Sequence, residues 1–164
     1  MNGLFEQLPT IRDIHRESFK SDQPFERIAA HFARDKGTVV LLSGSHTDSA
    51  QYHILAAKPW LQIQSKGKSV QVKTQNKTIC SKQEPLGAIQ TLLKQFKLPD
   101  NISAPYNNTP VAAGLFGYFS YDLKDRIEKL PRTCMESRLP DICLYAPAFI
   151  LTQEIKTGLT TLQI

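Results

Sequence analysis

A serine, a histidine and an aspartate lie close together in one polar segment, and these are the residue types of a nucleophilic catalytic triad. Ser43, His46 and Asp48 fall within the stretch SGSHTDSAQ, residues 43–51. In a triad the histidine takes the serine proton and the aspartate orients the histidine. The stretch lacks the glycine-flanked elbow that holds a nucleophilic serine on a sharp turn. Because small polar residues are typical of turns, we interpret it as a loop and expect no catalytic residue there.

Residue types that bind metal or phosphate are also present, but their spacing fits no common site. His46 and His53 flank a predicted strand without the ligand spacing of a zinc centre. The segment KGKS, residues 66–69, ends like a phosphate-binding loop, yet such a loop needs a glycine where the chain has Gln62. We therefore expect these residues to bind no metal and no cofactor.

Two glycines interrupt an apolar, aromatic run in the stretch AAGLFGYFSYDLKDRIEKLP, residues 112–131. Gly114 and Gly117 supply at most two of the three glycines of a dinucleotide-binding fingerprint. Glycine weakens a strand and usually marks a bend or the close approach of another backbone. We predict that both are structural and let a neighbouring backbone approach closely. The carboxylates of Asp122 and Asp125 fall in the first turn of a predicted helix, where the helix dipole favours negative charge without any acid–base role.

The spacing of apolar residues predicts helices and strands that occur in groups. Helices are expected over residues 22–36, 81–99 and 122–130. Strands are expected over residues 38–42, 52–57, 60–65, 69–74, 111–119, 142–152 and from 158 onward. Asp22 and Asp122 are predicted N-caps, and Ser81 with Glu84 has the spacing of a capping box. Because helices are grouped with β-meanders and do not alternate with single strands, we predict an α+β fold with mostly antiparallel sheets and two to three helices.

Length and composition indicate a globular protein. The chain has 164 residues, of which 41% are hydrophobic, which is enough for a domain with a sizeable core. It contains no apolar run long enough for a transmembrane helix, and its first residues are too polar for a secretory signal. Its three cysteines form no CxxC pair, which is typical of reduced thiols. We therefore expect a cytoplasmic protein that does not contact a membrane.

The net charge of +5 raises the possibility of nucleic-acid binding. The lysines are scattered, however, and the densest group, Lys66, Lys68, Lys73 and Lys77, fits the solvated face of a hairpin. Aromatic and basic residues do not alternate as they would on a base-stacking platform. We expect no nucleic-acid partner, although a freestanding basic module that binds nucleic acid or an acidic ligand stays open as an alternative of another class.

Three segments resemble the component I chains of aminodeoxychorismate (para-aminobenzoate) synthase and anthranilate synthase. Residues 112–131 are similar to the family pattern GGLxGYxxYDLxRxxExLP, with Ala113 in place of the first glycine. LLSGSHTDSAQYHILAAKPW, residues 41–60, resembles the family's early strand–loop–strand segment with its Ala-x-Pro. LPDICLYAPAFILT, residues 139–152, is similar to the strand that follows the family's helix. The three matches come in the family's order.

The resemblance implies an N-terminal, non-catalytic domain over residues 22–164, preceded by an N-terminal extension over residues 1–21. The catalytic domain, with its Mg²⁺-binding glutamates, would lie outside this chain. The chain alone is therefore expected to be inactive and to hold no metal or cofactor, as part of a transferase (aminodeoxychorismate synthase) or a lyase (anthranilate synthase). Its expected partners are its own catalytic domain and a glutamine amidotransferase subunit. The motif GLFGYFSYDL favours the para-aminobenzoate branch of folate biosynthesis, and the anthranilate branch of tryptophan biosynthesis is the alternative.

The resemblance also implies a tryptophan-type ligand pocket. Ser43 matches the small polar residue that faces this ligand in the family, and Leu42, Gln51 and Tyr52 match neighbouring positions. Gln51 stands where the family commonly has an arginine. A buried ammonium or carboxylate needs polar partners, which the Ser43 hydroxyl and backbone groups could supply. That Ser43 simply begins a turn stays open as the alternative.

Overall fold

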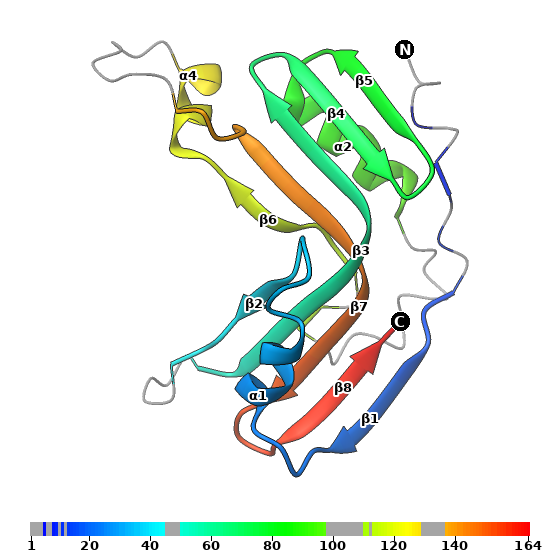
Figure 1. The fold of residues 1–164 in the computed structure, drawn as a ribbon, viewed down its shortest axis with the longest axis vertical. Helices are drawn as coiled ribbons and strands as arrows, with labels where there is room; N and C mark the ends of the chain where they lie inside the picture. The colour runs from blue at the N-terminus through cyan, green and yellow to red at the C-terminus, as the bar shows by residue number, and fades with distance from the viewer. Residues whose placement is uncertain are drawn as a thin grey trace. The chain divides into compact units, whose positions relative to one another are not determined.

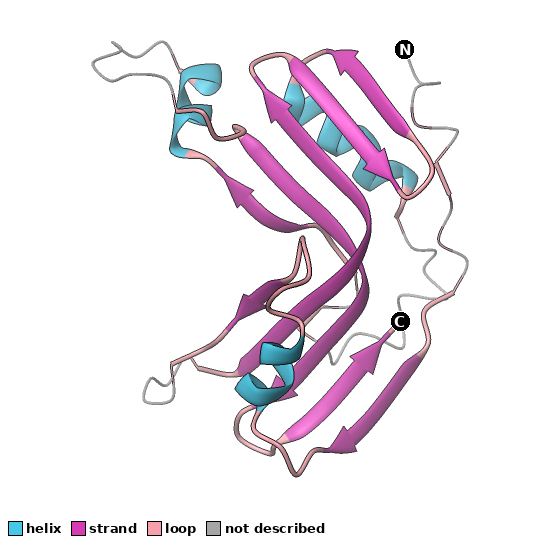
Figure 2. Ribbon diagram, in the orientation of Figure 1, coloured by secondary structure: helices cyan, strands magenta, loops and turns pink. Residues whose placement is uncertain are grey.

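The computed structural model describes residues 5, 8–9, 11, 13–44, 50–97, 110–111, 113–128 and 137–164. In chain order its elements are β1 (Arg16–Lys20), α1 (Phe25–His31), β2 (Val39–Leu41), β3 (Tyr52–Lys66), β4 (Ser69–Thr74), β5 (Thr78–Lys82), α2 (Pro85–Gln95), β6 (Phe116–Phe119), the 3-10 helix η2 (Tyr121–Leu123), α4 (Lys124–Ile127), β7 (Ile142–Glu154) and β8 (Leu159–Gln163). Strands dominate and helices are few (Figures 1 and 2). The strand pairs whose register is known are antiparallel, which confirms the predicted α+β class.

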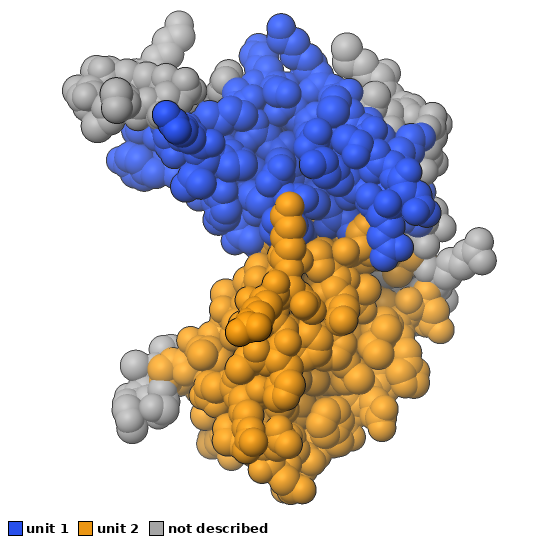
Figure 3. Space-filling view, viewed as in Figure 1, with its two compact units in different colours: residues 1–10, 61–97, 117–145 blue, residues 11–60, 98–116, 146–164 orange. Residues whose placement is uncertain are grey.

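The chain forms two compact units, coloured separately in Figure 3. Unit 1 comprises residues 1–10, 61–97 and 117–145, and unit 2 comprises residues 11–60, 98–116 and 146–164. Strands β3 and β7 each contribute residues to both units.

In unit 2, strands pair in the order β1-β8-β7-β3, and β2 pairs with β3. Helix α1 packs on one side of this sheet in a cluster of buried residues, Phe25, Ala29, Leu55, Ala57 and Leu151. A separate cluster contains Ala56, Phe116 and Ile150. Successive residues of β3 and β7 thus enter different clusters, as expected when neighbouring side chains of a strand point to opposite faces.

In unit 1, β4 pairs with both β3 and β5, and β6 pairs with β7. Helix α2 contacts β4 and lies across this part of the sheet (Figure 1). It buries Ala88, Ile89 and Leu92. The alternate residues Leu61, Ile63, Val70 and Val72 of the sheet are also buried. The alternation in the sequences WLQIQS and SVQVKT therefore predicts this hairpin correctly.

The helix caps expected from the sequence are wrong. Helix α1 begins after Pro24, and no side chain caps it, so Asp22 is not its N-cap. Helix α2 begins at Pro85 after Glu84, while Ser81 lies in β5 and takes no part in a capping box. Proline has no N–H to leave unsatisfied in the first turn and its φ angle already suits a helix, so it can begin a helix without a side-chain cap.

The elements around the glycines are shorter than expected. Of the strand predicted over residues 111–119, only Phe116–Phe119 forms β6, and residue 112 lies outside the described part of the chain. The helix predicted over residues 122–130 is replaced by η2 and the single turn of α4, and residues 129–130 are not among those described. Asp122 is not its cap, because its Oδ2 accepts a hydrogen bond from the Ser137 N–H at 3.3 Å.

The strands predicted over residues 52–57 and 60–65 are one strand, β3. The Lys-Pro pair between them does not end the strand, since β3 runs through both residues although Lys58 adopts a φ of 54°. The sequence pattern did not predict two further strands, β1 and β5. β1 lies inside the range 1–21 expected to be an extension, and it pairs with β8. The division at residues 21 and 22 stays a prediction.

Among the described residues, no helix has the length and apolar character needed to span a membrane.

Candidate functional site

Ser43 is fixed to the start of β3 by two hydrogen bonds. Its Oγ donates to the carbonyl oxygen of Tyr52 at 2.8 Å, and its N–H donates to Nδ1 of His53 at 3.3 Å. The His53 ring lies against Phe25, with 5.4 Å between the ring centroids. Because the Ser43 hydroxyl proton is already donated to Tyr52, the hydroxyl can offer a ligand only the lone pairs of its oxygen. Such a group accepts a hydrogen bond from an ammonium or an N–H but does not bind a carboxylate.

The other residues predicted for the tryptophan-type pocket lie on either side of this contact. Leu42 is adjacent to Ser43, and its side chain is 52% exposed. Gln51 is exposed, and its carbonyl oxygen accepts from the Ile155 N–H at 2.9 Å. Tyr52 begins β3 and is half-buried. The structure thus joins Ser43 to Tyr52 directly, whereas it shows Gln51 only as a backbone anchor.

His46 and Asp48 belong to residues 45–49, which lie outside the described part of the chain. The interpretation that Ser43, His46 and Asp48 form no catalytic triad therefore stays a prediction. The bonds made by Ser43 give it a structural role that needs no ligand, and the tryptophan-type pocket stays a prediction.

The two glycines differ sharply in their surroundings. Gly117 has a φ of 150°, and a Cβ placed on it would lie 2.1 Å from the carbonyl oxygen of Cys143 and 3.0 Å from the Cα of Leu144. At Gly114 a Cβ would meet only the ring of Phe116, at an ordinary distance of 3.9 Å. The close backbone approach expected at both positions therefore occurs at Gly117 alone, where β7 leaves no room for a side chain.

Asp141 holds together three segments of unit 1. Its carboxylate accepts from Lys66 Nζ at 2.9 Å and from the Gly67 N–H at 2.7 Å. Its backbone N–H donates to the Ser65 carbonyl, and its carbonyl accepts from the Ser120 N–H, both at 2.8 Å. The carboxylate side chain is only 8% exposed. A buried carboxylate with several donors of this kind stabilises a fold and leaves little capacity for acid–base chemistry.

A polar cluster that the sequence analysis missed lies between β3 and β7 in unit 1. Gln64 Nε2 lies 3.3 Å from Cys143 Sγ, and Gln62 Nε2 donates to the Tyr145 hydroxyl at 3.1 Å. Burial, followed by the hydrogen bond with Cys143, raises the pKa of Tyr145 to about 12. The phenol is therefore protonated at neutral pH and does not serve as a base. Polar residues at alternate positions of both strands were the signal that could have revealed this cluster.

The lysine-rich hairpin is partly neutralised. Lys66 pairs with Asp141, and Lys68 Nζ lies 3.0 Å from Glu84 Oε1. Within the described ranges, no three His, Cys, Asp or Glu side chains gather as a metal site would require. The strongest geometric features of the chain are therefore the structural contacts of Ser43, Gly117 and Asp141.

No family model matches the chain. Over 158 residues it is 26% identical to anthranilate synthase component 1 from Mycobacterium bovis and from two strains of Mycobacterium tuberculosis. These matches cover 94% of the chain and 30% of each mycobacterial protein. The crystal structure of anthranilate synthase component I from Streptococcus pneumoniae TIGR4 matches with a TM-score of 0.52 and 17% identity, over 92% of the chain and 30% of that protein.

The resemblance to the component I family of chorismate-utilising synthases is confirmed. The chain shares the fold of part of a component I protein, and it spans about 30% of the length of the relatives that it matches. Both product branches of the family stay open, because the named relatives are anthranilate synthases whereas the glycine motif favoured the other branch.

The segments that carry the component I resemblance also contain the three structural contacts. Ser43 lies in residues 41–60, Gly117 in residues 112–131 and Asp141 in residues 139–152. Each makes a contact that fixes one strand to another segment. In this chain, the residues that resemble the family are therefore ones on which the fold depends.

Proposed function

We propose that this chain is the N-terminal, non-catalytic domain of component I of a chorismate-utilising synthase. The observation that carries the proposal is the similarity itself, which takes in 94% of the chain but only 30% of each curated relative. The described residues add no constellation of catalytic groups. The polar cluster around Cys143 contains a phenol with a pKa of about 12 and makes its hydrogen bonds internally. The reaction would then take place in a catalytic domain that carries the Mg²⁺ site and receives nitrogen from a glutamine amidotransferase subunit.

For the product we prefer aminodeoxychorismate, the precursor of para-aminobenzoate and folate, because of the motif GLFGYFSYDL. Anthranilate is the second proposal, and the names of the matching relatives support it. The choice between amination and pyruvate elimination would be made in the catalytic domain. We place the protein in the cytoplasm, where such biosynthetic enzymes act.

The surface that would contact the catalytic domain is proposed to include β6, η2 and α4 of unit 1. Phe119, Tyr121 and Ile127 are exposed there by 53%, 82% and 67%. Lys124 Nζ lies 4.4 Å from the centre of the Tyr121 ring and so holds this aromatic side chain in place. We propose this surface because large exposed apolar side chains follow one another along these three consecutive elements, and exposed apolar patches are typical of interaction sites.

The test uses the chain together with the polypeptide encoded after the codon for Ile164, made as a separate protein. With chorismate, Mg²⁺ and ammonium, we expect no product from the chain alone and either aminodeoxychorismate or anthranilate from the mixture, identified by chromatography. Phe119→Ser should weaken the association of the two proteins, whereas Phe19→Ser, an exposed aromatic of unit 2, should not. Turnover of chorismate by the chain alone, or a stop codon after Ile164, would contradict the proposal.

We further propose that Ser43 contributes to a tryptophan site that the catalytic domain completes. The geometry that supports it is the acceptor capacity of the Ser43 hydroxyl oxygen beside the exposed side chain of Leu42. Calorimetric titration of the mixture with tryptophan should show binding that Ser43→Ala weakens. Ser21→Ala, which removes a hydroxyl from an exposed turn, is the matched control. Equal binding by both variants would remove Ser43 from the site.

The alternative of a freestanding basic module has weaker support, because Lys66 and Lys68 are held in ion pairs. Filter binding of a nucleic acid over a range of salt concentrations separates the two proposals. A steep loss of affinity with salt would favour nucleic-acid binding, since each phosphate contact releases counterions.

A further inference from the structure

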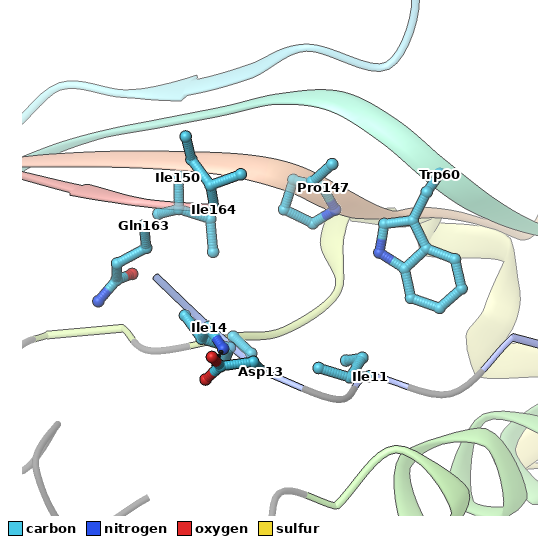
Figure 4. A pocket seen from close by; sticks show the side chains of 10 residues that line it. Ile11, Asp13, Ile14, Trp60, Pro147, Ile150, Gln163 and Ile164 are labelled. Atoms are coloured by element: carbon cyan, nitrogen blue, oxygen red, sulfur yellow. Dashed lines mark hydrogen bonds between the residues drawn. The ribbon is translucent and has the colours of Figure 1, made fainter. Parts of the chain in front are cut away.

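A cavity of about 230 Å³ lies within unit 2 (Figure 4). Its walls are largely apolar and include Ile14, Trp60, Pro147 and Ile150. Asp13 also lines it and is exposed, so the cavity is open to solvent at that point. None of the residues predicted for the tryptophan-type pocket lines this space.

One polar side chain in the wall is almost completely buried. Gln163 is 2% exposed, and among the described residues neither Nε2 nor Oε1 of its amide has a hydrogen-bond partner. By contrast, Gln153 of the same hairpin donates from its Nε2 to Thr160 Oγ1 at 3.1 Å. Buried amides in proteins nearly always find partners, because an unpaired buried donor or acceptor is costly. We therefore expect the Gln163 amide to form hydrogen bonds with a molecule in the cavity that it lines.

We propose that this cavity binds a small flat molecule whose polar edge carries a donor beside an acceptor, as in a primary carboxamide. The Gln163 amide presents N–H groups next to a carbonyl oxygen, and a carboxamide can pair with it through two hydrogen bonds. In the view of Figure 4, the Trp60 indole and the Gln163 amide lie toward opposite ends of the cavity. The indole thus offers a flat surface to the apolar end of the ligand.

Size and charge narrow the class of ligand further. At about 230 Å³ the cavity is smaller than pockets for drug-sized molecules and has room for roughly eight water volumes of about 30 Å³ each. This corresponds to a fragment with about as many non-hydrogen atoms as a substituted benzene ring. The Asp13 carboxylate disfavours an acid in the same place. A neutral aromatic amide meets these conditions, and the site is independent of the function proposed above.

The chain contains one tryptophan, Trp60, so its intrinsic fluorescence reports directly on the wall of the cavity. The probe is benzamide, and the matched control is acetophenone, which keeps the ring and the carbonyl but replaces the amide nitrogen by a methyl group. We expect a saturable change of Trp60 emission with benzamide and about tenfold weaker binding of acetophenone, the factor that one lost hydrogen bond represents. Equal affinities, or no saturable change, would overturn the proposal.

Two variants locate the effect. Gln163→Met keeps the side-chain length and removes both polar atoms, so it should bind the two compounds equally. Gln153→Met removes an amide that does not line the cavity and should keep the preference for benzamide. If Gln163→Met does not fold, the side-chain amide resonances of Gln163 in the unmodified chain serve instead, and they should shift on benzamide addition. A Gln163→Met variant that still prefers benzamide to acetophenone would overturn the proposal. Gln163 amide resonances that do not shift on benzamide addition would do the same.

Discussion

A side chain at Gly117 should destabilise the protein strongly, even when it is a single methyl group. In Gly117→Ala the new Cβ would lie 2.1 Å from the Cys143 carbonyl oxygen, so β6 or β7 must move. Forcing a packed backbone apart costs about 1–3 kcal/mol. The φ of 150° adds strain of about 1–3 kcal/mol for a residue with a Cβ. We expect a loss of about 4 kcal/mol in the free energy of unfolding, the middle of the summed range.

The matched control is Gly114→Ala. Its Cβ would meet only the Phe116 ring at 3.9 Å, so nothing has to move. We expect a change within about 1 kcal/mol, because an alanine that fits mainly reduces the freedom of the unfolded chain. In Gly117→Val the branched side chain multiplies the clash, and we expect the protein to unfold or precipitate.

The two alanine variants are compared by urea unfolding and by thermal melting. For a chain of this length, 4 kcal/mol corresponds to a melting temperature lower by roughly 8–16 °C. The Gly114→Ala melting temperature should stay within a few degrees of the unmodified protein. If Gly117→Ala and Gly114→Ala have the same melting temperature, the close approach of β7 is not the reason for glycine at position 117. The steric argument would then fail.

Three further substitutions probe the other contacts. Asp141→Ala should lower the free energy of unfolding by about 2–3 kcal/mol in urea titrations, because it removes the buried carboxylate that accepts from Lys66 Nζ and the Gly67 N–H. Glu84→Gln, which breaks an exposed ion pair, should cost at most about 1 kcal/mol, and equal effects would contradict the burial argument. Because the pKa of Tyr145 is about 12 in the folded chain, the unfolded chain loses this proton first as pH rises above 10, so stability should fall from pH 10 toward pH 12. Tyr145→Phe should flatten that decline when unfolding is measured at each pH, and a decline of the same slope would refute the assignment. Ser43→Ala should cost about 1 kcal/mol by loss of its hydrogen bond to the start of β3. Thermal melting against the unmodified protein measures this loss, and identical melting curves would remove that structural role.

The central strands could be predicted from the sequence because their residues either alternate regularly between apolar and polar or form one continuous apolar run. The alternation around Ile63 and Val72 gives the hairpin, and the apolar run from Ile142 gives β7. Here the buried face of the strand alone decides the pattern, so propensity and packing agree. The resemblance to the component I family could likewise be found, because it depends on the order of three motifs.

The strands β1 and β5, at the two ends of the main strand order, could not be predicted. β1 has the sequence RESFK and exposes four of its five residues, so it has no apolar face to give a periodic signal. Its strand conformation comes from pairing with β8, a partner far away in the sequence. The predicted caps Asp22 and Ser81 failed for a different reason, since Pro24 immediately before α1 and Pro85 at the start of α2 place the helix starts a few residues later.

Of the candidate site, the sequence located Ser43 and Tyr52 but not what they contact. Capture of the Ser43 hydroxyl by the Tyr52 carbonyl depends on the register of β2 on β3. The cavity beside Gln163 was also beyond sequence reasoning, because a glutamine in an alternating strand is normally placed on the wet face. Only the pairing of β8 with both β1 and β7 shows that this glutamine is buried.

The pairing of β1 with β8 has a consequence for how the protein is made. Residues 16–20 leave the ribosome long before their hydrogen-bonding partners, residues 159–163, are synthesised. β1 therefore remains solvated and without its strand partner while most of unit 2 is translated. A waiting segment rich in β-branched residues would attract other nascent chains, whereas Arg16, Glu17 and Lys20 keep it in water until β8 arrives. The polar residues that leave β1 without a periodic apolar pattern thus also protect the unpaired segment from aggregation.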